Sequence, residues 1–142
     1  MPFKINLSHT GKTIKYEIEN EDLVGQKIGD VLDGKAISDE LEGYELEITG
    51  TSDKAGFPGL KGETGPRLRK KLMTYGTGMK KRPRKEGKKK VSSPRGLRLR
   101  KSVRGNEVSM DTVQINAKVK KLGKANFADL GQKPATEEAP AQ

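Results

Sequence analysis

Residues 3–18 read Phe-Lys-Ile-Asn-Leu-Ser-His-Thr-Gly-Lys-Thr-Ile-Lys-Tyr-Glu-Ile, and this stretch decides the fold class. Apolar and polar residues alternate over residues 3–8 and again over residues 13–18, which is the period of a strand with one buried face. The four residues between the two runs include Gly11, so we expect a tight turn there. The chain therefore opens with a predicted β-hairpin.

The same alternation recurs along the rest of the chain, at residues 44–49, 97–103 and 113–119. Residues 66–75 fit a short helix or a basic strand almost equally well, because their two leucines have helical spacing while cations cover the other positions. Six to eight short strands with Gly-containing turns, and at most two short helices, predict a mostly β fold. We expect a small β-barrel-like domain, closed or partly open.

The apolar pattern fades near Gly123, where we place the end of the folded region. We therefore predict one β-rich domain over residues 1–123, followed by a flexible, disordered C-terminal tail over residues 124–142. Within the domain, residues 76–96 hold almost nothing apolar, and such a segment cannot bury enough surface to fold alone. It is expected to form an extended basic loop.

Charge is distributed very unevenly around the formal net value of +10. Residues 1–53 carry 5 lysines against 12 acidic residues, while residues 54–105 carry 19 lysines and arginines against 2 acidic residues. Every arginine of the chain lies in that second segment, and residues 106–142 are neutral. A block of this kind repels itself unless a polyanion neutralises it, so the charge predicts a polyanionic partner.

The partner is expected to be a folded nucleic acid rather than a membrane. A membrane-surface segment pairs its cations with an amphipathic apolar face, which residues 76–96 lack. Tyr75 is the one aromatic side chain placed to stack on bases, so recognition by shape and backbone is favoured over reading of single strands. No stretch is apolar enough to span a bilayer and the N-terminus lacks a signal-peptide pattern, so we expect a cytoplasmic protein.

The sequence offers little for catalysis or metal binding. Its single histidine, His9, lies in the predicted turn without an evident nucleophile or orienting group, and no cysteine is present. The glycine-rich run at residues 76–80 lacks the spacing of a P-loop. We expect no enzyme activity, cofactor, metal or small-molecule substrate. An RNA-directed enzyme using His9 or Asp53 as a base is the least favoured hypothesis.

Candidate RNA-binding residues are the cations of the basic segment, because lysine and arginine side chains bind phosphates and arginine also stacks on bases. Among them, Arg98 and Arg104 are expected to contribute most if they share one strand face. A free regulatory or chromatin-type nucleic-acid-binding protein is the alternative interpretation. The candidates are Lys54, Arg67, Arg69, Lys70, Lys71, Lys80, Lys81, Arg82, Arg84, Lys85, Lys88, Lys89, Lys90, Arg95, Arg98, Arg100, Lys101 and Arg104.

Two motifs carry a family resemblance. Asp53-Lys54-Ala55-Gly56-Phe57-Pro58 follows an apolar strand, and Arg100-Lys101-Ser102-Val103-Arg104-Gly105 comes some 40 residues later, after Arg82-Pro83-Arg84-Lys85. In this order and spacing they resemble the archaeal and eukaryotic type of small-subunit ribosomal protein six, over roughly residues 3–123. The resemblance implies a mostly β, non-catalytic structural protein of the small ribosomal subunit. It would bind ribosomal RNA and contact neighbouring ribosomal proteins.

The resemblance also implies roles for particular segments. The basic strand (Arg98, Arg100, Lys101, Arg104) and the basic loop (Arg82, Arg84, Lys85) would lie on the RNA, and residues 53–58 would form a fixed turn.

Two features depart from the eukaryotic members. Gly59 stands where they usually have Met, and the long basic C-terminal helix with phosphorylatable serines is missing. The short tail with Glu137 and Glu138 is of the archaeal type, so growth signalling through kinases is not expected.

Overall fold

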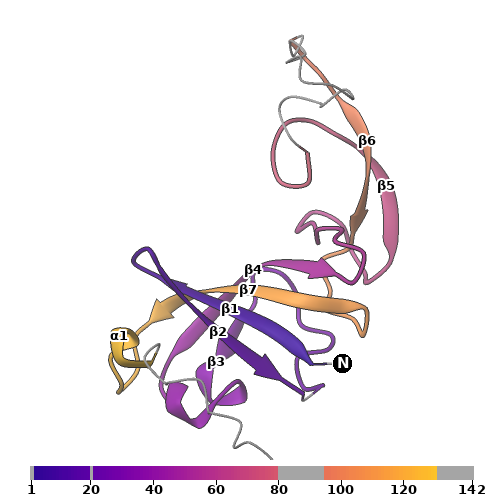
Figure 1. The fold of residues 1–142 in the computed structure, drawn as a ribbon. Coiled ribbons are helices and arrows are strands. Elements are labelled where there is room, and N and C mark those ends of the chain that lie inside the picture. The colour runs from indigo at the N-terminus through magenta and orange to yellow at the C-terminus, as the bar shows by residue number, and fades with distance from the viewer. Residues whose placement is uncertain (1, 20, 80–94, 131–142) are drawn as a thin grey trace, which may run out of the picture.

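The computed structural model describes residues 2–19, 21–79 and 95–130, and its strands form a five-stranded sheet and a two-stranded ribbon (Figure 1). The sheet has the order β2-β1-β7-β4-β3, in which β1 and β7 run parallel and the other neighbours run antiparallel. The sheet strands are β1 (Phe3–His9), β2 (Lys12–Ile18), β3 (Val31–Asp33), β4 (Glu45–Asp53) and β7 (Thr112–Lys121), and the ribbon strands are β5 (Leu68–Met73) and β6 (Leu99–Arg104).

The opening hairpin is confirmed. β1 and β2 pair from Phe3 opposite Ile18 to His9 opposite Lys12, so the turn has two residues. Both turn residues have positive φ, +45° at Thr10 and +80° at Gly11. These angles match a type I′ turn, whose twist suits antiparallel strands.

The mostly β prediction is confirmed, but the barrel-like arrangement is not supported. Among the described residues the sheet is open, with β2 and β3 as its two edges. β5 and β6 pair with neither edge of this sheet, and half of their residues are exposed. They pair with each other instead and project from one end of the sheet (Figure 1). The ambiguous residues 66–75 thus contain a basic strand.

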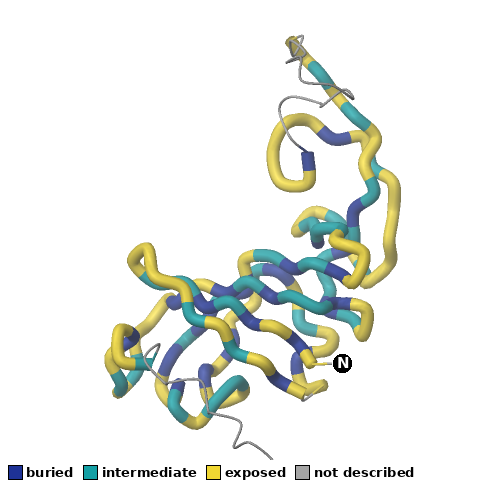
Figure 2. Tube along the Cα trace, viewed as in Figure 1, coloured by how far each residue is buried: buried dark blue, intermediate teal, exposed yellow. Residues whose placement is uncertain are grey.

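The main core lies on one face of the five-stranded sheet, where the apolar positions of the central strands are fully buried (Figure 2). Cross-strand neighbours such as Leu7 opposite Ala117, and Leu46 opposite Val119, supply it. The segment between β2 and β4 covers this face and contains the short 3-10 helices η1 (Gly34–Ala36) and η2 (Asp39–Leu41). We call the sheet together with its covering segments the lobe.

The lobe continues beyond Gly123, where the sequence placed the start of the tail. The hydroxyl of Tyr44 donates to the carbonyl oxygen of Ala125, and Phe127 is buried in the main core. Phe127 begins a single-turn helix, α1 (Phe127–Leu130), at the end of the sheet opposite the ribbon (Figure 1). Residues 125–130 therefore pack on the β-rich region, and residues 131–142 lie outside the described part.

A second, smaller core lies within the ribbon. Met73, Met79 and Val103 are buried together, and Leu60, Leu97 and Leu99 pack against them. One ribbon face is therefore occupied by the chain itself. No helix in the described ranges has the length and apolar character needed to cross a bilayer.

Candidate nucleic-acid interface

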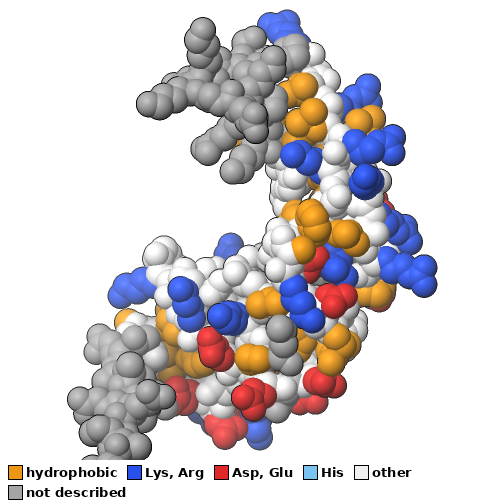
Figure 3. Space-filling model, turned by 45° about the vertical axis from the view of Figure 1, so that its right-hand side comes forward, with side chains coloured by type: hydrophobic (Ala, Val, Ile, Leu, Met, Phe, Trp, Pro, Cys, Tyr) orange, Lys and Arg blue, Asp and Glu red, His pale blue; other side chains and the backbone are white. Residues whose placement is uncertain are grey.

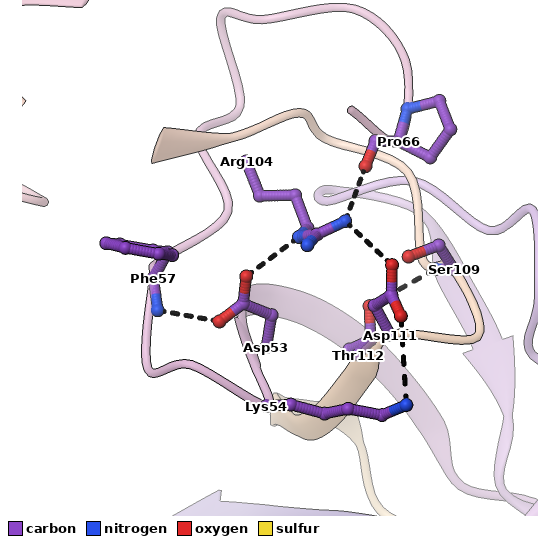
Figure 4. A network of polar contacts seen from close by, with 8 residues as sticks. All are labelled: Asp53, Lys54, Phe57, Pro66, Arg104, Ser109, Asp111 and Thr112. Atoms are coloured by element: carbon purple, nitrogen blue, oxygen red, sulfur yellow. Dashed lines mark hydrogen bonds and ion pairs between the residues drawn. The ribbon is translucent and has the colours of Figure 1, made fainter. Parts of the chain in front are cut away.

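The guanidinium group of Arg104 lies at the base of the ribbon and binds three acceptors (Figure 4). Its Nε donates to Oδ2 of Asp53 at 2.9 Å, while its NH1 donates to the carbonyl oxygen of Pro66 at 3.1 Å and to Oδ2 of Asp111 at 3.3 Å. The side chains of Asp53 and Arg104 are 2% and 15% exposed, so this ion pair is largely shielded from water. Such a pair fixes geometry, because each charge needs the other once both have left water.

Asp53 also holds the turn that follows β4. Its Oδ1 accepts a hydrogen bond from the backbone N–H of Phe57 at 2.8 Å, and its own N–H donates to the carbonyl oxygen of Phe57. Gly56 supplies the positive φ, +85°, that lets the chain reverse. The two motifs that carried the family resemblance are thus joined directly, because Asp53 belongs to the first and Arg104 to the second.

Backbone contacts lock the ribbon to this turn. The N–H of Arg104 donates to the carbonyl oxygen of Pro58, and the N–H of Leu60 donates to the carbonyl oxygen of Arg104, each at 2.9 Å. A Cβ at Gly105 would lie 1.6 Å from the carbonyl oxygen of Gly65, so only glycine fits there. The base of the ribbon is therefore a closely packed joint with the lobe.

The position that departs from the eukaryotic pattern, Gly59, lies in the same joint. A Cβ there would come 2.1 Å from Oγ1 of Thr51 and 3.0 Å from Cδ1 of Ile28, so the glycine lets the turn approach β4 closely.

The register of the ribbon separates its side chains into two faces. Leu68, Lys70 and Leu72 lie opposite Arg104, Ser102 and Arg100, and neighbours across an antiparallel pair share a face. We call this the outer face. The inner face carries Arg69, Lys71 and Met73 opposite Val103, Lys101 and Leu99, and it includes the residues of the smaller core.

Glu63 neutralises part of the inner face. Its carboxylate lies 2.5 Å from Nζ of Lys71 and 3.8 Å from NH1 of Arg69. The hydrogen bond and charge of Lys71, with a smaller contribution from Arg69, lower the pKa of Glu63 below its usual value. The negative charge of Glu63 also offsets the repulsion between Lys71 and Lys101, which face each other across the strands.

The structure divides the eighteen candidate residues into three groups. Lys54, Arg69, Lys71 and Arg104 form ion pairs with acidic residues. Six others are exposed and have no acidic partner among the described residues: Arg67, Lys70, Arg95, Arg98, Arg100 and Lys101. The remaining eight, Lys80, Lys81, Arg82, Arg84, Lys85, Lys88, Lys89 and Lys90, lie outside the described residues.

Arg98 and Arg104, expected to contribute most, differ in environment. Arg98 is exposed, whereas Arg104 is held inside the joint. Sequence reasoning missed the acidic partners Glu63 and Asp111. For Glu63 a signal existed, since it is one of only two acidic residues in the basic segment.

Charge is distributed unevenly over the molecule. Figure 3 shows blue Lys and Arg side chains along the ribbon and on the upper part of the lobe, while the lower part of the lobe carries mainly red Asp and Glu side chains. Lysine and arginine side chains that lack an acidic partner can bind the phosphates of a nucleic acid. This binding is favourable because it releases the counterions condensed on the phosphates.

His9 and Asp53, the two residues considered as catalytic bases, are both in contact with other groups of the protein. The ring of His9 packs edge-on against Phe127, and both oxygens of Asp53 bind other groups. Within the described ranges, no group of three or more potential ligands could hold a metal ion.

Comparisons with known proteins identify the family. The family model described as "Ribosomal protein S6e" matches residues 1–132. A Methanococcus maripaludis protein named "Small ribosomal subunit protein eS6" is 39% identical over 140 residues, which cover 97% of this chain and 100% of the relative. A protein of the same name from Methanosphaera stadtmanae is 38% identical over 97% of this chain and 98% of its own length. Another, from Methanocaldococcus jannaschii, is 40% identical over 85% of this chain and 82% of its own.

These archaeal relatives are matched over most or all of their own length, which confirms the resemblance to the short archaeal form. The alternative, a free regulatory or chromatin-type protein, is not supported. The motif pair that Arg104 joins lies wholly within the matched region, and the chain belongs to the S6e family of ribosomal proteins.

Proposed function

We propose that this protein is a structural component of the small ribosomal subunit, in which its ribbon binds ribosomal RNA. Family membership supports the place in the subunit. The observation that carries the RNA contact is the set of six exposed cations, three on the ribbon strands and three in the segments that adjoin them, that lack an acidic partner in the described part of the chain. Unpaired cations at this density are stabilised by a polyanion.

The paired cations have a different role in this proposal. Arg104 acts as a positioning residue, because its bonds to Asp53 and Asp111 hold the base of the ribbon on the lobe. Arg69 and Lys71 keep their inner face compact through Glu63, and Lys54 lies 3.7 Å from Asp111. The eight cations between residues 80 and 90 belong to the interface on sequence grounds.

The remaining features complete the proposal. In this proposal the RNA-binding domain spans residues 1–130, because Phe127 packs in its main core, with residues 76–96 as its basic loop and residues 131–142 as the tail. Neighbouring ribosomal proteins contact the lobe, the particle is cytoplasmic, and the protein performs no catalysis.

Binding to purified small-subunit ribosomal RNA over a range of salt tests this function. Replacing Lys70, Arg98 and Arg100 together by Ala should reduce the slope of log affinity against log salt by about 2 to 3, at roughly 0.7–0.9 per lost phosphate contact. The matched control replaces Lys12, Lys15 and Lys35 of the lobe, and its slope should stay unchanged. Equal slopes for wild type and the ribbon variant would overturn the proposal.

A further inference from the structure

We infer that the ribbon binds RNA through its outer face, lying along the shallow groove of an RNA duplex with Leu68 and Leu72 against riboses. This rests on the proposed function and names the face and the form of RNA that it takes. The relevant residues are Leu68, Lys70 and Leu72 on β5, and Arg100 and Ser102 on β6.

The inner face is already occupied. Met73, Leu99 and Val103 pack with Met79 and Leu60, which excludes RNA from most of that face. Lys71 and Lys101 lie opposite each other on the inner face, and the charge of Lys71 is neutralised by Glu63. A carboxylate in this position also repels an approaching phosphate.

The outer face has the opposite character. Lys70 and Arg100 are exposed, without an acidic partner in the described residues. Leu68 and Leu72 are 45% and 52% exposed, although they lie beside these cations. Exposed apolar side chains that alternate with cations on a regular face indicate a contact surface.

Charge complementarity selects RNA as the occupant. A protein surface would need carboxylates matched to Lys70 and Arg100, whereas a nucleic acid supplies phosphates at regular spacing. The minor groove of an A-form helix is wide and shallow and displays 2′-hydroxyls, so it is accessible to a two-stranded ribbon. The minor groove of DNA also accepts apolar side chains, and in RNA the hydroxyl of Ser102 can bond a 2′-hydroxyl.

The spacing of Leu68 and Leu72 along β5 allows two separate contacts with one groove. Leu68 and Leu72 are four residues apart, which is about 13 Å along a strand. Lys70 lies between them, opposite Ser102. The leucines can therefore contact the groove at two points while Lys70 and Arg100 reach the phosphates beside it.

Single cysteines provide the first test, because the chain has none. Leu72→Cys places a probe on the outer face, and Lys101→Cys places one on the inner face at an exposed position. Each variant is assembled into small subunits and loaded with tethered iron–EDTA, and RNA cleavage is mapped. Strong cleavage from position 72, in two patches facing each other across one minor groove, with weak cleavage from position 101, is expected.

The other outcomes separate the two proposals. Cleavage from position 101 that equals or exceeds that from position 72 overturns the outer-face inference but leaves RNA binding by the ribbon intact. Cleavage from position 101 with none from position 72 also overturns the inference, and is the result expected if a protein covers the outer face. If neither position gives RNA cleavage in an assembled particle, RNA binding by the ribbon is overturned as well.

Affinity measurements provide the second test. Leu72→Ser should weaken binding to small-subunit RNA about tenfold, because an apolar contact is lost. The slope against log salt should not change, because no charge is removed. Leu122→Ser, at a lobe leucine that is 54% exposed, is the matched control and should leave affinity unchanged. Equal affinities for Leu72→Ser and wild type would overturn the groove contact.

Discussion

Arg104 Nε lies 2.9 Å from Asp53 Oδ2, although the two residues are 51 positions apart in the sequence. The bond joins the end of β4 to the end of β6, and so connects the sheet to the ribbon. This shielded ion pair is thus one of the contacts that hold the ribbon on the lobe.

Replacing Arg104 should therefore destabilise the protein strongly. Arg104→Ala leaves the buried carboxylate of Asp53 without its cation, and such a loss costs about 3 kcal/mol or more. Arg104→Lys should retain only part of this stability, because an ammonium group cannot reproduce the arrangement of the guanidinium donors. Urea unfolding measures both variants.

A double-mutant cycle checks the cause. Asp53→Ala with Arg104→Ala should cost less than the sum of the two single changes, because the second change removes a charge already left unpaired. Strict additivity would show that the pair does not couple the sheet to the ribbon.

The close packing at Gly105 makes a second prediction. Gly105→Ala places a methyl group where the carbonyl oxygen of Gly65 lies, so backbone must move, and the expected loss is about 2–3 kcal/mol. Gly62→Ala is the matched control, since nothing lies within 4 Å of a Cβ there and its φ is not positive. A thermal melt in which the two variants coincide would contradict this account of the joint.

The third prediction concerns pH and the inner face of the ribbon. Because the pKa of Glu63 is lowered in the folded protein, its contribution to stability is present above the unfolded value of about 4.5 and is lost as pH falls through the folded pKa. The stability difference between wild type and Glu63→Gln should therefore be constant near neutral pH and shrink in acid. Urea unfolding of both proteins between neutral pH and strongly acidic pH measures it. A difference that grows in acid has the wrong sign.

The fourth prediction concerns the segment after β7. Phe127 is 6% exposed, and truncating a buried phenylalanine to alanine typically costs about 3–5 kcal/mol. Phe127→Ala should lower the melting temperature, and a chain that stops after Gly123 should melt lower than one that stops after Leu130. The exposed neighbour Ala128, changed to Ser, serves as the control. Identical melting of the two truncated chains would place the end of the fold at Gly123.

The structural features that the sequence predicted correctly are those that depend on residues close together along the chain. Alternation located the hairpin and the strands that hold Leu46 and Ile115, because each strand's period is a local property. Closure into a barrel depends on which distant edges pair, and alternation carries no information about that. The alternation over β6 is that of a sheet strand, and the region of β5 fitted a helix or a strand, yet the two strands pair only with each other among the described residues.

The candidate interface shows the same division. Composition identified the basic segment, but it treats Arg104 and Arg100 alike. The carboxylates of Asp53, 51 positions away, and Asp111, seven positions away, distinguish them. Phe127 left no pattern to detect, since it is the one buried residue of a single helical turn.

The strand order also determines when the molecule can fold. β7 lies between β1 and β4, and the side chain of Asn116 bonds that of Asn6, 110 positions earlier. During synthesis, β1 and β4 leave the exit tunnel long before this central strand exists, and non-local pairing of this kind is slow. The arginine-rich stretch emerges in between. It is consequently available to nucleic acid while the polypeptide still lacks the strand that completes its sheet.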